Sequence, residues 1–277
     1  MNKVFFVAVI VILPMAGIYS CKTPENPGKP VMNANRDLPV TIDLFNGKNL
    51  DGWYTFIRDR GRDIDPKKVF TVEDSFIHVS GEEYGCITTN EEYENYSLTV
   101  EFKWGKRTHA PRQENARDNG ILLHSTGKDG GYDGTWMHSI ECQLIEGGTG
   151  DLLVVGDKSP DYALSSPVAP EKQNGTYIFQ PGGSLAEINS GRINWFGRDS
   201  AWQDTIGFRG KKDIEKPLGE WNRIECVAAG DKLTVMLNGI LVNQAFKVKP
   251  SKGRIQIQSE GAEIFFRNVR LTSLVTE

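Results

Sequence analysis

The sequence predicts an all-β fold, a sandwich or jelly roll of antiparallel sheets. Three observations support this class: short runs in which apolar and polar residues alternate, turn-forming Gly, Asn, Asp and Pro between the runs, and no long helical periodicity. The composition, with 39% hydrophobic and 25% charged residues, is that of an ordinary globular protein. The 277 residues form no internal repeat, and we expect one large β domain.

The N-terminus carries features of an exported protein. Lys3 precedes an apolar run at residues 4–15, as in a secretory signal peptide, and this run is too short for a comfortable transmembrane helix. The segment that ends at Cys21 resembles a bacterial lipobox, whose cysteine is lipidated. We therefore expect a lipoprotein signal peptide over residues 1–20 and a lipid on Cys21, with a simple secretory signal as the alternative.

The signal is followed by a polar, proline-rich stretch and then by the predicted fold. Residues 21–40 have the composition of an extended tether, and residues 41–277 form the predicted β domain. No acidic run follows Cys21. We expect the protein to be lipid-anchored in the bacterial cell envelope and to face the periplasm.

Alternating runs place ten strands along the domain. The clearest is the run at 96–104, in which Tyr96, Leu98, Val100, Phe102 and Trp104 share one face; their burial contributes on the order of 10 kcal/mol before entropy is counted. The predicted strands cover residues 69–72, 76–79, 97–104, 120–124, 139–145, 223–227, 232–237, 240–243, 254–258 and 264–271.

Turns and cysteines complete this prediction. Asn238-Gly239 is typical of a type I′ hairpin turn. Residues 105–118 and 157–220 are less regular, and the second segment holds aromatic residues that either cap the core or line a cleft. Cys142 and Cys226 fall on apolar faces, so we expect buried thiols, and the sequence has no cysteine–histidine spacing typical of zinc sites.

The stretch at 138–151 points most directly to function. Ile140, Cys142 and Leu144 alternate with polar residues, so Glu141 and Gln143 share the opposite face of a strand. Charged and amide side chains are poor strand formers, which favours a surface that binds a polar ligand. A solvated outer face is the alternative. The glycine-rich tail supplies a loop at the strand end, where sites are often built.

The net charge excludes nucleic acids as expected ligands, and two acidic residues are candidates for metal binding. The net charge is −4 and no basic stripe stands out, so we expect no nucleic-acid partner. Glu146 and Asp151 flank the glycine loop and are weak candidates for a divalent metal, either Ca²⁺ or a transition metal held with a histidine. Carboxylates in such places more often cap turns.

Several segments, taken in order along the chain, resemble the DUF1080 family, also called the 3-keto-disaccharide hydrolase domain. They span roughly residues 41–275, and the ordered set carries the resemblance rather than any one segment. The segments are residues 44–53, Asp118-Asn119-Gly120-Ile121-Leu122-Leu123-His124, Ser139-Ile140-Glu141-Cys142-Gln143, Gly219-Glu220-Trp221-Asn222-Arg223, Leu237-Asn238-Gly239, and Ile257-Gln258 through Phe266-Arg267-Asn268-Val269-Arg270.

The resemblance implies a concanavalin-like jelly roll of two antiparallel sheets with a concave polar face. It also implies cleavage of glycosides whose C3 hydroxyl has become a ketone. The ketone acidifies the C2 proton, so a base can remove it and the C1 substituent then leaves; water can add afterwards. Such a reaction needs a base, a donor at the C3 oxygen and an acid for the leaving oxygen.

The predicted catalytic pair is His124 and Glu141. His124 shares parity with Gly120, and an imidazole titrates near neutral pH; Glu141 is the base or orients the imidazole. The residues assigned to substrate binding include amides for sugar hydroxyls and an aromatic ring for stacking, and they are Gln143, Gln258, Trp136, His138 and Asn119.

The expected function is therefore a hydrolase or lyase of 3-keto-glycosides, with an oxidised sugar or glycoside as its partner and the membrane reached through the lipid. The alternative is a non-catalytic carbohydrate-binding lipoprotein, which needs no proton-transfer group. A scaffold protein is a third reading; it would not need the mid-strand residues Glu101, Lys103, Glu141 and Gln143 to converge.

Overall fold

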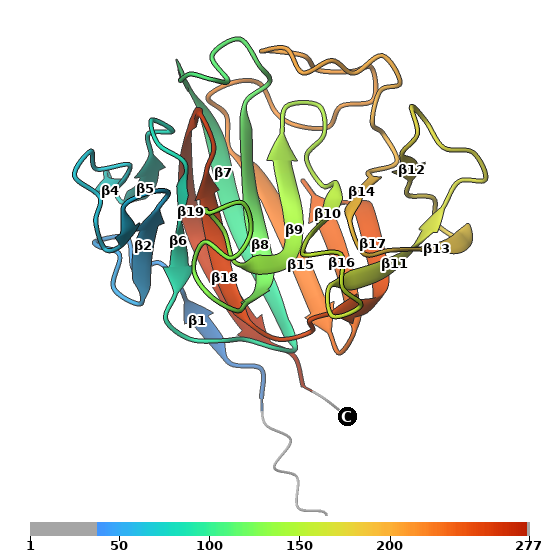
Figure 1. Cartoon of the computed structure of the whole chain (residues 1–277), viewed down its shortest axis with the longest axis horizontal. Helices are drawn as coiled ribbons and strands as arrows, with labels where there is room; N and C mark the ends of the chain where they lie inside the picture. Colours follow the sequence, from blue (N-terminus) through green and yellow to red (C-terminus); the bar gives the residue numbers. More distant parts are fainter. Residues whose placement is uncertain (1–37, 276–277) are drawn as a thin grey trace, which may run out of the picture. The chain divides into compact units, whose positions relative to one another are not determined.

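The structure, a computed structural model, describes residues 38–275, and all regular elements there are β-strands. They form two sheets, one behind the other in Figure 1, so the predicted all-β jelly-roll sandwich is confirmed. The predicted signal peptide, the lipid on Cys21 and nearly all of the tether lie outside the described residues. No helix within residues 38–275 is long and apolar enough to span a membrane.

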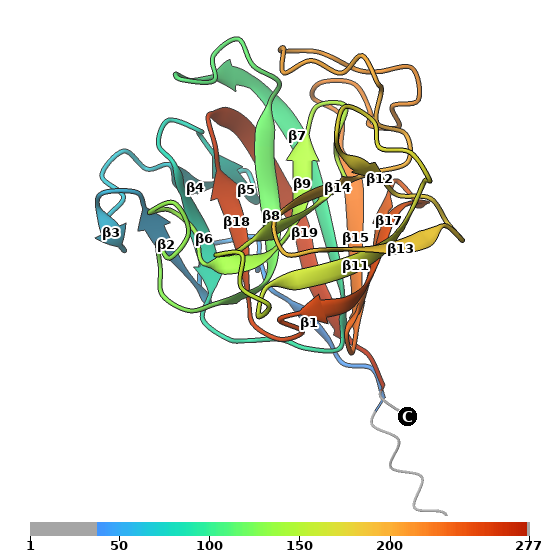
Figure 2. The same cartoon turned by 45° about the vertical axis from the view of Figure 1, so that its right-hand side comes forward.

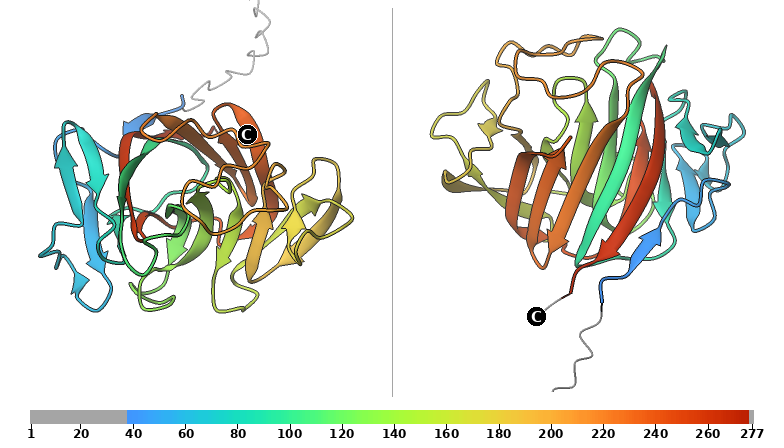
Figure 3. Two further views of the ribbon diagram at one scale, coloured as in Figure 1. Left: turned by 90° about the horizontal axis from the view of Figure 1, so that it is seen from above. Right: turned by 180° about the vertical axis from the view of Figure 1, so that it is seen from behind.

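One sheet has ten strands, in the order β13-β11-β17-β16-β15-β7-β19-β5-β4, with β1 paired to β19. It faces the viewer in the right-hand view of Figure 3. Its strands are β1 (Thr41–Asp43), β4 (Phe70–Glu73), β5 (Phe76–Val79), β7 (Tyr96–Thr108), β11 (Ala163–Val168), β13 (Ser184–Ile188), β15 (Asn222–Ala229), β16 (Lys232–Leu237), β17 (Ile240–Lys249) and β19 (Ala262–Ser273).

The other sheet has nine strands, in the order β12-β14-β10-β9-β8-β18-β6-β2-β3, and only β12 and β14 pair in parallel within the described residues. Its central strands lie in front in Figures 1 and 2. They are β2 (Trp53–Ile57), β3 (Gly61–Arg62), β6 (Gly85–Thr89), β8 (Asp118–Thr126), β9 (His138–Ile145), β10 (Leu152–Val155), β12 (Tyr177–Ile178), β14 (Gly191–Asn194) and β18 (Arg254–Ser259).

The hydrophobic core lies between the two sheets. The five predicted inward residues of β7 are all buried, and none is more than 3% exposed. They meet the inward residues of the other sheet, among them Ile121, Cys142 and Ile257, in one continuous cluster. Cys142 and Cys226 are buried free thiols, as predicted.

Residues 157–220 are more regular than their sequence predicts. This segment contains β11 to β14, which are short and interrupted by glycine and proline, so alternation alone does not reveal them. Its aromatic residues divide between two roles: Trp195 is 1% exposed and belongs to the core, whereas Trp202 lines a cavity.

Candidate functional site

The outer face of the nine-stranded sheet carries the polar residues of β9. Ile140, Cys142 and Leu144 belong to the core, so Glu141 and Gln143 point to the opposite face, which confirms that they share a side of the strand. Gln143 lies opposite Gly120 of β8 in the register. The strand thus brings a carboxylate and an amide to the middle of the sheet.

Gly120 is the point at which neighbouring strands come together. A Cβ atom at this position would overlap the Oε1 atoms of Glu141 and Gln258, and it would stand 2.9 Å from the Glu141 Cδ. The absence of a side chain on β8 therefore lets β9 and β18 direct Glu141 and Gln258 into one space. Gln258 joins Glu141 at the site, although strand β8 lies between their strands in the sheet order.

Loops cover this polar face, so it is not a solvated surface. Glu141 is 4% exposed and Gln258 is 1% exposed. Trp136, in the loop between β8 and β9, packs on Cys86 and Leu122 of the same face. Trp136 therefore lies on the same face as the polar residues, and its Nε1 is buried without a hydrogen-bond partner in the described part of the chain.

Three carboxyl groups lie near one another on this face. Burial raises the pKa of Glu141 to about 8, and the neighbouring Asp118 contributes. Burial also raises the pKa of Asp118 to about 7, against the effect of Arg112, whose guanidinium lies 3.0 Å from its carboxylate. The pKa of Glu260 is raised well above its ordinary value by burial, then by Asp118 and Glu141. Such a cluster retains protons near neutral pH.

Neither Asp118 nor Glu260 was singled out from the sequence as a site residue. A signal existed, because Asp118 precedes Gly120 by two residues and Glu260 follows Gln258 by two. Extending the period of two beyond the strand centre would have placed both carboxyls on the polar face. Asp118 is also tied to the site by Gln143, whose Nε2 donates a hydrogen bond to it.

A cavity of about 750 Å³ opens beside the carboxyl cluster. Glu260 belongs to both. The cavity offers two tyrosines and a tryptophan, which suit the apolar faces of a sugar ring, together with an arginine for polar contacts. Its walls are Arg58, Tyr84, Pro111, Tyr132, Asp133, Trp136 and Glu260.

The predicted approach of His124 to Glu141 is wrong. The register of β8 shifts between Leu123 and Thr126, and His124 has φ 55°, so a β-bulge reverses the expected parity. Its ring packs edge-on against Tyr96 of the other sheet, at 5.6 Å between centroids, and its Nδ1 donates to the carbonyl of Pro250 at 2.9 Å. His124 therefore lies between the sheets.

Of the five residues assigned to substrate binding, Trp136 alone lines the cavity, and Asn119 and His138 make structural contacts instead. The amide of Asn119 donates to the backbone carbonyl of Gln258 at 2.6 Å, and its oxygen accepts the Gly120 amide, so Asn119 links β8 to β18. The ring of His138 packs against Tyr162 and its Nε2 donates to the carbonyl of Gly131 at 3.1 Å.

Two of the mid-strand polar residues belong to a different surface. Glu101 accepts a hydrogen bond from Arg267 at 2.6 Å on the outer face of the ten-stranded sheet, and the Lys103 ammonium lies 4.9 Å from the Trp221 ring centroid there. They do not converge with Glu141 and Gln143.

The family model of the 3-keto-alpha-glucoside-1,2-lyase-like domain matches residues 40–272. The chain belongs to this family. The predicted resemblance is thereby confirmed, and the 3-keto-glucoside lyase-like domain gives the protein a carbohydrate-active role. Comparison with curated proteins finds no match.

Solved structures share the fold of this lyase-like domain. Two candidate glycosyl hydrolases from Parabacteroides distasonis each superpose with a TM-score of 0.50. One is 18% identical, with 84% of this chain and 94% of that chain covered; the other is 20% identical, with 85% and 100% covered. At these identities the likeness concerns the architecture.

The proposed metal ligands of the lyase-like domain are held by arginines. Glu146 accepts a hydrogen bond from Arg117 at 2.7 Å, and Asp151 accepts one from Arg198 at 2.7 Å. Each carboxylate is buried and has a cationic partner, an arrangement that satisfies its charge without a metal. No cluster of three or more potential ligands occurs in residues 38–275.

Proposed function

We propose that the protein is a lyase of 3-keto-glycosides that removes the C2 proton and eliminates the C1 substituent. The observation that carries the proposal is the cluster of Asp118, Glu141 and Glu260 beside an aromatic cavity. The family name supports the same chemistry. Carboxyl groups with raised pKa values can act both as bases and as proton donors near neutral pH.

Glu141 is the proposed base. In its ionised form it takes the proton from C2, which the adjacent C3 ketone has acidified, and the electron pair forms an enolate. The bond from C1 to the glycosidic oxygen then breaks, leaving a double bond between C1 and C2. Burial, which raises the pKa of Glu141, makes its carboxylate a stronger base than an exposed one.

Two further groups complete the reaction. Glu260, at the cavity wall, is the proposed acid that donates a proton to the departing oxygen, since burial raises its pKa and thereby favours its protonated form. The amide of Gln258, beside Glu141, is the proposed hydrogen-bond donor to the C3 oxygen as negative charge develops there. Trp136 is the proposed stacking platform for the oxidised ring.

The proposed reaction is tested by whether it requires a ketone at C3 of the substrate. Purified protein is incubated with a 3-keto-glucoside and with the unoxidised parent, and the products are identified by NMR. We expect cleavage of the keto sugar alone, with a product unsaturated between C1 and C2 or its hydrate. Equal cleavage of both substrates would indicate a conventional glycosidase, and binding without turnover would favour the carbohydrate-binding alternative.

The role of Glu141 is tested by Glu141→Gln. The loss of a general base lowers kcat by ~10²–10⁴-fold, and the fold should persist because the amide keeps the shape of the carboxyl. Glu101→Gln is the matched control, since it makes the same change in mid-strand on the outer face of the other sheet. Similar kcat values for these two variants would remove Glu141 from the reaction.

A further inference from the structure

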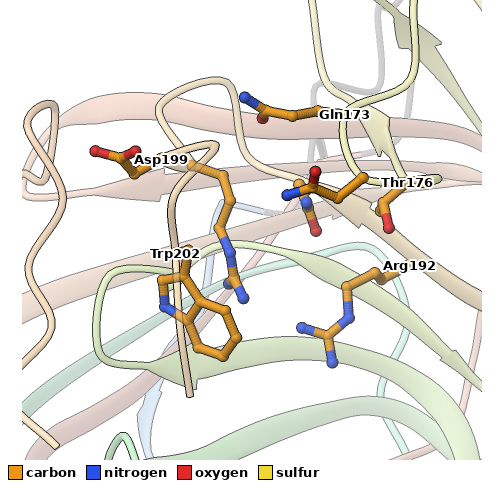
Figure 4. Close-up of a pocket in the computed structure, with 8 residues that line it drawn as sticks. Gln173, Thr176, Arg192, Asp199 and Trp202 are labelled. Atoms are coloured by element: carbon orange, nitrogen blue, oxygen red, sulfur yellow. The ribbon is translucent and has the colours of Figure 1, made fainter. Parts of the chain in front are cut away.

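A second cavity, of about 290 Å³, lies at the β14 side of the same sheet face. Figure 4 shows the Arg192 guanidinium and the Trp202 ring directed into the space between them. Amide side chains and a hydroxyl make up much of the remainder. The lining residues are Gln173, Asn174, Thr176, Arg192, Asn194, Arg198, Asp199 and Trp202.

The strand register aligns this cavity with the proposed base. Glu141 on β9 pairs with Leu153 on β10, and Leu153 pairs with Arg192 on β14. The three residues therefore form one row across the sheet, on the same face. Since neighbouring strands are about 4.8 Å apart, the backbones of Glu141 and Arg192 are separated by roughly 10 Å. The second cavity thus lies next to the reaction site, on the side opposite the aromatic cavity.

Two guanidiniums at this cavity share one carboxylate. Arg192 and Arg198 both approach a single carboxylate, Asp151, at 3.5 Å and 2.7 Å. Asp199 does not supply a second anion, because its carboxylate accepts the backbone amides of Ala201 and Lys211 and points away from Arg192 and Trp202 in Figure 4. The two guanidiniums face the cavity with one buried negative charge between them.

Other groups fit a sugar ring at this position. Asn194 is 8% exposed, and its Oδ1 is buried without a hydrogen-bond partner in residues 38–275, so it can accept from a hydroxyl. The Trp202 ring is held by Arg198, whose Cζ lies 3.9 Å from its centroid. An aromatic surface, free guanidinium donors and an unsatisfied amide oxygen are the contacts that an acidic sugar requires.

We propose that this cavity is the leaving-group subsite and that it takes a sugar bearing a carboxylate. The name leaving-group subsite rests on the proposed lyase function. The binding of an acidic sugar does not depend on catalysis. The Arg192 fork receives the carboxylate, Asn194 accepts a hydroxyl proton and Trp202 contacts the ring. The substrate class is then a 3-keto-glycosyl uronate.

The test is a direct binding measurement that needs no turnover. Methyl β-glucuronide and methyl β-glucoside are titrated into the wild-type protein and into Arg192→Gln by calorimetry. A charge-assisted pair predicts about tenfold or greater preference for the glucuronide in the wild type, and a ratio near one in Arg192→Gln. Arg192→Lys keeps the charge without the fork and should keep part of the preference.

A matched control separates this site from general charge effects. Arg223→Gln removes a guanidinium from the outer face of the ten-stranded sheet and should keep the wild-type preference. Equal affinities for both sugars in the wild type, or a preference that survives in Arg192→Gln, would overturn the subsite. Absence of keto-sugar cleavage would overturn the lyase proposal alone, because the binding ratio does not depend on it.

Discussion

His124 shows how one residue can reverse the sheet face that strand alternation predicts. Its left-handed conformation adds a residue to β8 and turns the imidazole into the core, against Tyr96. Burial then lowers the pKa of His124 to about 4. A histidine that stays neutral at physiological pH, and whose Nε2 is enclosed by protein, is a packing residue rather than a base for substrate.

The buried imidazole predicts a dependence of stability on pH. The folded-state pKa lies below the unfolded value of about 6.5, so the unfolded chain binds the proton first and stability falls as the pH drops from 6.5 toward 4. Between pH 7 and pH 5 this group should cost on the order of 2 kcal/mol. Raised carboxyl pKa values act in the opposite direction, so the comparison requires a variant.

His124→Asn isolates this contribution. Asn tolerates the left-handed conformation and can place an amide donor near the Pro250 carbonyl. Urea unfolding at pH 7 and pH 5 should show a smaller loss of stability for the variant than for the wild type, and cleavage of a 3-keto-glucoside should persist. A loss of kcat in a folded His124→Asn protein would restore the histidine to the mechanism.

Strands β8, β9 and β18 form the functional element, and Gly120 sets its shape. Gly120 has no left-handed φ, so its backbone accepts a side chain, and only the space above it forbids one. Gly120→Ala should displace Glu141 and Gln258 and lower kcat by ~10²-fold, because catalysis depends on placement to within about an ångström. Circular dichroism should still report the β fold. An active Gly120→Ala enzyme would contradict the placement of the base beside Gln258.

The alternation that defined β7 and β9 could be read from the sequence because their neighbours bury one face throughout. The strongest hairpin was also predictable, since Asn238 and Gly239 both adopt positive φ. The bulge at His124 could not be foreseen, because left-handed backbone is uncommon even for histidine, which is enriched in it, and the residues around it continue a regular strand pattern. Arg192 was missed because β14 has only four residues, and its role depends on Asp151 and Arg198, which are distant in sequence.

The whole domain is closed by its first strand. β1 pairs with β19, with Thr41 opposite Thr272, so the two ends of the described chain lie side by side in Figure 1. Leu44 and Phe45 follow β1 into the core, and the carbonyl of Leu44 accepts the Trp53 indole at 2.6 Å. The start of the domain is therefore fastened by packing rather than by the short strand alone.

This arrangement predicts where the chain can be shortened. A chain that begins at Met32 keeps β1, Leu44 and Phe45, and it should unfold in urea at the same midpoint as a chain with the tether. A chain that begins at Asn46 loses them and should be less stable by several kcal/mol, at about 1.5–3 kcal/mol for each large apolar side chain. Equal midpoints for the two shortened chains would show that this packing is dispensable.

The adjacent ends of the domain also determine how it responds to a mechanical pull. Tension applied between residue 40 and residue 273 acts at the same end of the antiparallel pair formed by β1 and β19. The three residue pairs of these strands therefore separate one after another. Peeling of this kind resists far less force than sliding two long strands past each other. The strand that yields first belongs to the ten-stranded sheet, whereas Glu141 and Gln258 lie on the other sheet. A stretched protein can therefore extend by its first few residues while the carboxyl cluster stays assembled.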